Sequence, residues 1–132
     1  MFRVIIAGSR DFSDYDVLKS YADVKLSNIS RRDSIEVVSG CARGADTLGE
    51  RYAEERGYGI KKFPADWNRY GKSAGYLRNV EMAEYADALI AFWDGKSKGT
   101  EHMICIAKKS WIEDWNQISR IESARSALSI DI

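Results

Sequence analysis

The sequence is poor in residues on which several large classes of protein depend. Its 132 residues include one proline, one histidine and two cysteines. His102 alone cannot build a multi-histidine metal site, and Cys41 and Cys105 are too widely separated for close metal-ligand spacing or a disulfide framework. We therefore expect no metal and no cofactor. A reducing, cytoplasmic setting fits this use of cysteine best.

An excess of one charge and long apolar runs are also missing. Lysine and arginine together number 20, as do aspartate and glutamate, so no overall positive field would draw the chain to nucleic acid. The apolar run at residues 2–7 is too short for a membrane span or a signal peptide. Neither a membrane nor nucleic acid is an expected partner.

What the sequence does contain is an alternation of two patterns. Short apolar runs typical of buried strands occupy residues 3–7, 36–39, 60–63 and 88–93, and helical periodicity follows them at 15–26, 45–56, 74–85 and 100–109. Strands that are apolar on both faces, with helices between them, favour a parallel sheet covered on both sides. The sequence therefore predicts an α/β fold: one Rossmann-like domain over 1–132, with a doubly wound, mainly parallel sheet.

The end of the chain departs from this alternation. Trp111, Trp115, Ile118 and Leu128 are spaced so that they can line one face of a helix, and we predict an amphipathic C-terminal helix over about 111–127. Such an apolar stripe is hidden either by packing on the chain's own sheet or by pairing with a second copy. A homodimer through this segment is the expectation that we favour.

Four loops follow the predicted strands, at residues 8–11, 39–46, 64–72 and 94–100. In a parallel sheet these loops meet at one edge, where ligands bind. Three of them combine glycine with hydroxyl or basic residues just before a helix, where free N–H groups favour an anion such as phosphate. Each loop alone is equally explained as a capped glycine turn, and their convergence favours a site. The predicted ligand-binding residues are Gly8, Ser9, Arg10, Ser39, Gly40, Arg43, Gly44, Asp46, Asp66, Trp67, Arg78, Asn79, Asp94, Gly95, Ser97, Gly99 and Thr100.

Several of these residues have a second, structural interpretation that the sequence leaves open. Arg78 either faces the pocket or lies in solvent, and Trp67 either stacks on a base or packs against the protein. Asp46, Asp66 and Asp94 can each accept a hydrogen bond from a ribose hydroxyl or stabilise a turn or helix end. The spaced-glycine fingerprint of dinucleotide-binding enzymes is missing after the first strand, which disfavours hydride transfer.

The same segments resemble a known family. VIIAGSRD (4–11), SGCARGAD (39–46), FPADW (63–67), GYLRN (75–79) and ALIAFWDG (88–95) with GT (99–100) are similar to the YspA-like (DUF2493) branch of the SLOG superfamily. This Rossmann-like group includes the LOG phosphoribohydrolases and the DNA-processing protein DprA. The resemblance covers residues 2 to about 109, whereas the tail at 110–132 shows no clear match.

The resemblance implies a pocket for a nucleotide or nucleotide-derived ligand, with Gly99 and Thr100 at the phosphate and Arg78 in the position of the LOG arginine. LOG enzymes carry a catalytic glutamate three residues after that threonine, and here the position holds Met103. Glu101 lies two positions earlier, about 200° away around a helix. Cleavage of an N-glycosidic bond is therefore not expected.

Three functions follow, in order of preference. The first is a sensing or sequestering domain that binds a phosphate-bearing nucleotide or its derivative without turning it over. The second is a LOG-like nucleoside monophosphate phosphoribohydrolase, in which Glu101 or Asp94 supplies the carboxylate and Arg78 positions the phosphate. The third is single-stranded DNA binding by analogy with DprA, which needs a basic groove that the balanced charge does not indicate.

Overall fold

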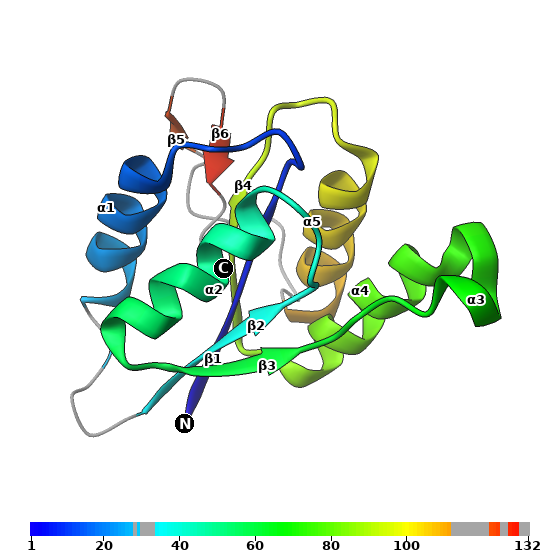
Figure 1. The fold of residues 1–132 in the computed structure, drawn as a ribbon, viewed down its shortest axis with the longest axis horizontal. Helices are drawn as coiled ribbons and strands as arrows, with labels where there is room; N and C mark the ends of the chain where they lie inside the picture. Colours follow the sequence, from blue (N-terminus) through cyan, green and yellow to red (C-terminus); the bar gives the residue numbers. More distant parts are fainter. Residues whose placement is uncertain (28, 30–33, 112–121, 125–126, 130–132) are drawn as a thin grey trace.

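The computed structural model describes residues 1–27, 29, 34–111, 122–124 and 127–129. Four strands form one parallel sheet in the order β3-β2-β1-β4: β1 (Phe2–Gly8), β2 (Ile35–Ser39), β3 (Gly59–Lys62) and β4 (Ala88–Phe92). The longer helices are α1 (Tyr15–Leu26), α2 (Ala45–Arg56), α4 (Ala74–Tyr85) and α5 (Lys98–Trp111). The predicted α/β architecture with a parallel sheet is confirmed (Figure 1).

Helices cover both faces of the sheet because alternate side chains of each strand point to opposite sides. Along β1, Val4 and Ile6 join a core that includes Tyr52 of α2 and residues of α1. Their neighbours Ile5 and Ala7 join a second core against α4 and α5. The doubly wound arrangement is thus a consequence of strands that are apolar on both faces.

The strand order reverses beside β1. From β1 the chain moves outward through β2 to β3, and then returns to place β4 on the other side of β1. At the carboxyl end of this pair, Gly8 lies opposite Phe92, and a Cβ added to Gly8 would lie 2.3 Å from the Phe92 carbonyl oxygen. The closely packed β1–β4 junction is the topological switch point, where open α/β sheets bind ligands.

Most element boundaries agree with the sequence patterns, but the region after the third strand differs. The edge strand β3 begins one residue earlier than predicted and is largely exposed. The stretch expected to be a loop contains the short helix α3 (Trp67–Tyr70) and the 3-10 turn η1 (Gly71–Ser73). Asp66 caps α3 by accepting a hydrogen bond from Arg69 N at 3.1 Å, which explains why a helix starts there. In Figure 1, α3 lies at the opposite end of the molecule from α1.

The predicted extent of the C-terminal helix is wrong, although α5 does provide a C-terminal helix. In place of the later part of the predicted helix over 111–127, the structure has two short strands, β5 (Glu122–Ala124) and β6 (Ala127–Ser129). They pair antiparallel, and β6 lies beside β4. Pairing of the two strands satisfies backbone N–H and C=O groups without a helix. Trp115 and Ile118 lie outside the described residues, so the apolar stripe and the homodimer remain predictions. No helix among the described residues is long and apolar enough to cross a membrane.

Candidate functional site

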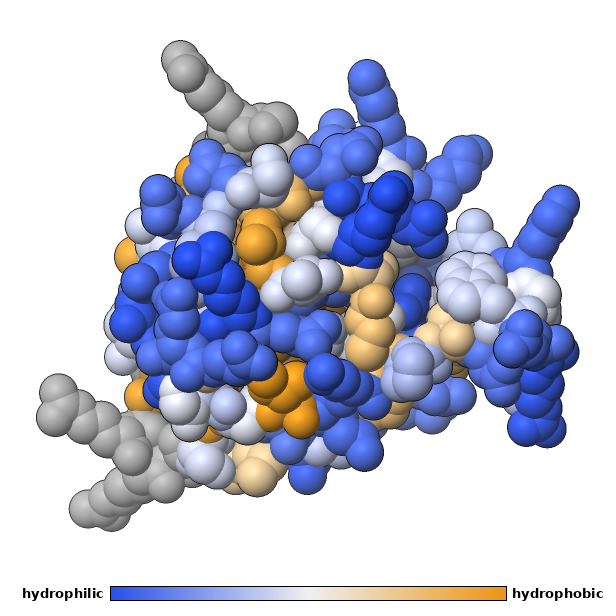
Figure 2. All heavy atoms as spheres, viewed as in Figure 1, coloured by the Kyte–Doolittle hydropathy of each residue, from blue (hydrophilic) through white to orange (hydrophobic). Residues whose placement is uncertain are grey.

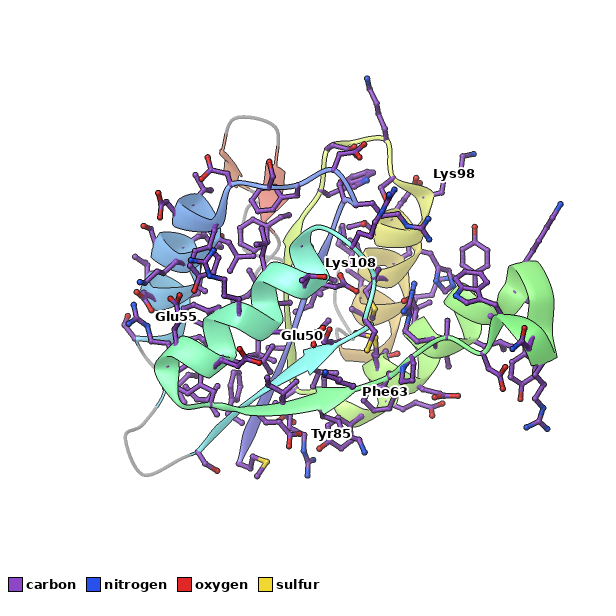
Figure 3. All side chains as sticks on the ribbon, in the orientation of Figure 1. Glu50, Glu55, Phe63, Tyr85, Lys98 and Lys108 are labelled. Atoms are coloured by element: carbon purple, nitrogen blue, oxygen red, sulfur yellow. The ribbon has the colours of Figure 1, made fainter. Side chains whose placement is uncertain are left out.

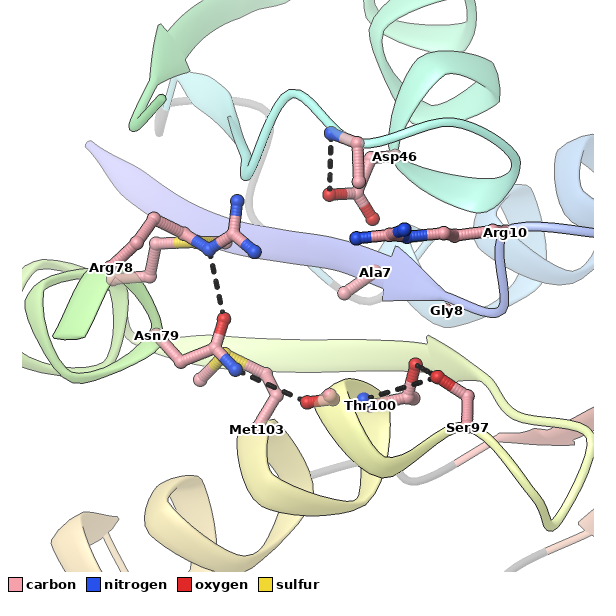
Figure 4. A pocket seen from close by; sticks show the side chains of 12 residues that line it. Ala7, Gly8, Arg10, Asp46, Arg78, Asn79, Ser97, Thr100 and Met103 are labelled. Carbon is pink, nitrogen blue, oxygen red and sulfur yellow. Dashed lines mark hydrogen bonds between the residues drawn. The ribbon is translucent and has the colours of Figure 1, made fainter. Parts of the chain in front are cut away.

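A cavity of about 70 Å³ opens at the carboxyl end of β1 and β4 (Figure 4). We call it the switch-point cavity. Loops or helices that follow all four strands of the sheet contribute to it. The predicted residues that line it are Gly8, Arg10, Asp46, Arg78, Asn79, Ser97, Gly99 and Thr100.

A wider and more open compartment, the Trp67 groove, adjoins this cavity. It encloses about 360 Å³ and shares Arg10, Ala42 and Arg78 with the cavity. Of the predicted residues, Arg10, Gly40, Arg43, Trp67 and Arg78 line it. The indole of Trp67 is 51% exposed, which is unusual for a tryptophan that serves only packing. Together the two compartments form one site with a narrow end and a broad end.

The loop after β4 shapes the narrow end. Asp94 Oδ1 accepts hydrogen bonds from the backbone N–H groups of Lys96 and Ser97, both at 2.8 Å, and these bonds lower the pKa of Asp94. Ser97 Oγ lies 3.1 Å from Thr100 Oγ1 and accepts a long bond from Thr100 N at 3.5 Å. The first N–H groups of α5 have no intrahelical partner. The loop therefore presents two hydroxyls and a helix N-terminus to the cavity.

Arg78 is positioned between the two compartments by several partners. Its Nη1 donates to the Gly40 carbonyl oxygen, and its Nε donates to Asn79 Oδ1 at 3.0 Å. The Asn79 amide in turn donates to the Gly99 carbonyl oxygen at 3.1 Å and lies 3.2 Å from Nδ1 of His102. Burial lowers the pKa of His102, so the neutral ring can accept this bond. The guanidinium is thus held by the loop after β2 and by Asn79 of α4, which α5 holds in turn, and Arg78 is not a solvated surface arginine.

Asp46 is the one acidic residue among the described residues that line the cavity. It is the second residue of α2 and only 5% exposed. Burial raises the pKa of Asp46 to about 6, although hydrogen bonds from the backbone N–H groups of Ala42 and Gly8 and the charge of Arg78 act in the opposite direction. A carboxyl with this pKa changes its charge near neutral pH, which is typical of functional sites.

Two guanidinium groups lie on the cavity wall with this single carboxyl. Burial lowers the pKa of Arg78, and the positive charge of Arg10 lowers it further, whereas Asp46 and Cys41 raise it. Figure 4 shows Arg10 and Arg78 extending toward the cavity from opposite sides. Like charges held this way repel one another, and an anion bound in the cavity would relieve that repulsion.

Three of the predicted ligand-binding residues have a structural role, because they connect or position loops and helices of the fold. Ser9 Oγ accepts from Asp94 N at 3.0 Å and so ties the first and fourth loops together. Ser39 Oγ donates to Glu50 at 2.8 Å, and Figure 3 shows Glu50 on α2 above the sheet. Gly44 begins α2 with a φ of 77°, where a Cβ would lie 2.3 Å from the Ser9 carbonyl oxygen.

Four other residues that the sequence offered as binding or catalytic candidates lie outside both compartments. They are Asp66, Asp94, Gly95 and Glu101, none of which lines the cavity or the groove. Asp94 and Glu101 are exposed, so the carboxylates that the hydrolase hypothesis requires do not face the cavity.

Apolar and small residues of the site were missed at the sequence level. Ala7, Ala42, Met82 and Met103 also line the cavity, and Cys41, Pro64 and Ala65 line the groove. Met82 and Met103 are buried in the core between α4 and α5, and their helical periodicity signals only that core. Ala42 acts through its backbone N–H, which donates to Asp46 Oδ2 at 3.3 Å and leaves no trace in the residue type.

Comparisons with known proteins give two matches. The model of the family described as "YspA, cpYpsA-related SLOG family" matches residues 2–70, which include the first two loops, α2 and the capped start of α3. The "Gene 61 protein" of Mycobacterium phage D29 is 38% identical over 119 residues, covering 85% of this chain and 93% of the phage protein. No solved structure is significantly similar to the chain.

Proposed function

Because this chain belongs to the YspA, cpYpsA-related SLOG family, we propose that the switch-point cavity and the Trp67 groove together bind a phosphate-bearing nucleotide or nucleotide derivative. The protein acts in this proposal as a sensing or sequestering domain. The observation that carries it is the presence of Arg10 and Arg78 in one small cavity with the first turn of α5.

The narrow end suits the phosphate. A cavity of about 70 Å³ is well below the usual size of a small-molecule site, so it admits a phosphate and the adjoining edge of a sugar, and not a whole nucleoside. Two arginines, the hydroxyls of Ser97 and Thr100 and the N-terminal turn of a 14-residue helix all favour a compact anion. Phosphate matches each of these donors.

The broad end suits the base. Trp67 offers an exposed aromatic face in a groove of about 360 Å³, with Arg43 and the backbone of Gly40 beside it. Stacking on an aromatic ring recognises any base because every base has a π-face. A ligand that reaches from the cavity into the groove therefore has a phosphate at one end and a ring at the other.

Of the two proposed activities, the residues that line the cavity support ligand binding without turnover better than hydrolysis. Met103, where LOG enzymes carry glutamate, is 2% exposed and presents a thioether to the cavity. Glu101 and Asp94 are exposed and do not line it. Asp46 is the one feature that favours the hydrolase alternative, because a buried carboxyl with a pKa of about 6 can act as an acid or base.

Isothermal titration calorimetry with the common ribonucleoside 5′-mono- and diphosphates tests the proposal. We expect at least one to bind with a dissociation constant in the micromolar range, and Arg78→Met to weaken that binding by about 100-fold. Arg69→Met, an exposed arginine on α3 outside both compartments, is the matched control. No binding of any nucleotide, or equal binding by Arg78→Met, contradicts the proposal. Release of free base above background would favour the hydrolase instead.

A further inference from the structure

The three aspartates that are equivalent candidates in the sequence have different surroundings in the structure. Asp66 is exposed and accepts from Arg69 N as the cap of α3. Asp94 is exposed and accepts from two N–H groups of its own loop. Neither lines the cavity or the groove, so the structure leaves Asp46 as the carboxyl that a bound ligand can contact.

Asp46 retains acceptor capacity toward the cavity. A carboxylate can accept about four hydrogen bonds. Backbone N–H groups of Ala42 and Gly8 supply two to Asp46, and the bond from Ala42 is long at 3.3 Å. Figure 4 shows the carboxyl on the cavity wall, facing the space between Arg10 and Arg78. Asp46 can therefore accept a further hydrogen bond at the cavity wall.

We propose that Asp46 accepts a hydrogen bond from a ribose hydroxyl of the bound nucleotide, so that the site selects ribonucleotides over their deoxy counterparts. This inference rests on the proposed nucleotide function. It adds a specificity-determining residue and narrows the ligand to a class that carries that hydroxyl.

The chemistry of the cavity points to a hydroxyl and not to another group. A carboxylate repels phosphate, so the phosphate belongs at Ser97 and Thr100, on the other side of the cavity from Asp46 (Figure 4). The sugar is bonded directly to that phosphate, and it is therefore the part of a nucleotide that reaches the opposite wall of so small a cavity. The base extends further, into the groove beside Trp67, and a base amine is correspondingly distant from Asp46.

A hydroxyl donates more strongly to the ionised carboxylate than to the neutral acid. The charged groups around Asp46 are Arg78 from α4, Arg10 from the loop after β1 and Glu50 from α2. Arg78 favours the ionised form, and Glu50 and burial oppose it. Selection for the hydroxyl is thus strongest at a pH above the pKa of Asp46, which is about 6.

The test compares matched nucleotides on the wild-type protein at pH 8. Each ribonucleoside 5′-phosphate that binds is titrated beside its 2′-deoxy and 3′-deoxy counterparts, because the geometry does not favour one hydroxyl over the other. We expect one of the two deoxy compounds to bind at least tenfold more weakly, since removing the donor leaves a buried acceptor unpaired. In Asp46→Asn that ratio should fall below about threefold, because the neutral amide oxygen is a weaker acceptor.

Asp16→Asn is the matched control, because Asp16 is the second residue of α1 as Asp46 is of α2, and it is exposed and outside both compartments. It should leave the ratio unchanged. Equal binding of ribo and both deoxy forms by the wild type overturns the inference and leaves the nucleotide function standing. Retention of the full ratio in Asp46→Asn overturns the assignment to Asp46, and binding of no nucleotide removes the underlying function. If Asp46→Asn fails to fold, the wild-type comparison alone still decides whether the site selects the hydroxyl.

Discussion

The two compartments of the site differ in how firmly their residues are held. In the switch-point cavity, Asn79 is bonded to Arg78, Gly99 and His102, and Thr100 is 5% exposed. In the groove, Trp67 is half exposed on a four-residue helix. A rigid cavity is preorganised for one small group, whereas a loosely held groove can adapt to several. The comparison indicates that affinity comes from the narrow end and tolerance of different bases from the broad end.

The difference follows from which elements build each compartment. The cavity lies between β1 and β4, with α4 and α5 packed over the central strands and their side chains buried in one core. The groove lies toward the exposed edge strand β3 and the short α3. Figure 3 shows Phe63 and Tyr85 near this edge. Their ring centroids are 5.4 Å apart. The face in Figure 2 is mainly hydrophilic, with hydrophobic side chains scattered over it.

The largest effect is expected from Arg78→Met, because Arg78 lines both compartments. Loss of charge-assisted hydrogen bonds to phosphate should weaken nucleotide binding by about 100-fold, or about 3 kcal/mol. Arg78→Lys should recover part of the affinity because it restores the charge but not the fork of donors. Calorimetric titration measures both, and equal affinity of Arg78→Met and wild type would show that the compartments do not share a ligand.

Replacing Asp46 should change stability in a pH-dependent way. A carboxyl whose folded pKa of about 6 exceeds its ordinary 3.8 binds its proton more tightly when folded, so its contribution to stability falls as pH rises through 4 to 6. Asp46→Asn should therefore raise the free energy of unfolding of the ligand-free protein at pH 8 by up to about 3 kcal/mol, with little effect at pH 4.

Urea unfolding at the two pH values checks this prediction. The control Asp16→Asn has the same place in its helix and measures the loss of the helix-dipole interaction alone. A variant less stable than wild type at pH 8 would contradict the prediction, because it would mean that the buried carboxylate stabilises the fold.

A smaller loss is expected at the first turn of α5. Thr100→Val keeps the shape of a buried side chain and removes the hydroxyl that faces Ser97, so nucleotide affinity should fall about tenfold. Thr100→Ser keeps the hydroxyl and should bind within about threefold of wild type. Identical affinity of the valine variant and wild type would remove Thr100 from the phosphate end.

The smallest effect belongs to the groove. Trp67→Ala should weaken binding three- to tenfold for every base alike, roughly the loss of one stacking contact. Tyr70→Ala, an exposed aromatic on the same helix that does not line the groove, should have no effect. Titration with purine and pyrimidine nucleotides measures this loss of affinity for each base. A loss confined to one base would contradict the prediction, because it would show that the groove selects among bases.

The sequence predicted the framework well because its signals are local. Apolar runs and helical periods placed α1, α2 and α4 at their observed bounds, and the motif resemblance is confirmed by the family match. The roles of the three aspartates could not be separated, because capping and ligand contact use the same residue type. Only the fold shows that Asp94 bonds its own loop whereas Asp46 faces the cavity.

The errors have a common origin in long-range packing. The helix expected over 111–127 rested on four large apolar residues, and the described part of that range after Trp111 instead pairs as β5 and β6, with β6 beside β4. The hydrogen bond that joins Arg78 to Gly40 links residues 38 positions apart. No periodicity in the sequence carries information of this kind, since the contacts depend on how the strands are ordered in the sheet.

Native mass spectrometry of the protein purified from cells tests the central claim most directly. We expect the wild-type protein to carry an additional mass that matches a phosphorylated ribonucleotide or derivative, and Arg78→Met, purified in parallel, to lose it. The released compound should bind again to the emptied wild-type protein. If the wild type carries no such mass and binds none of the ribonucleotides offered to it, the cleft at the switch point is not a nucleotide site.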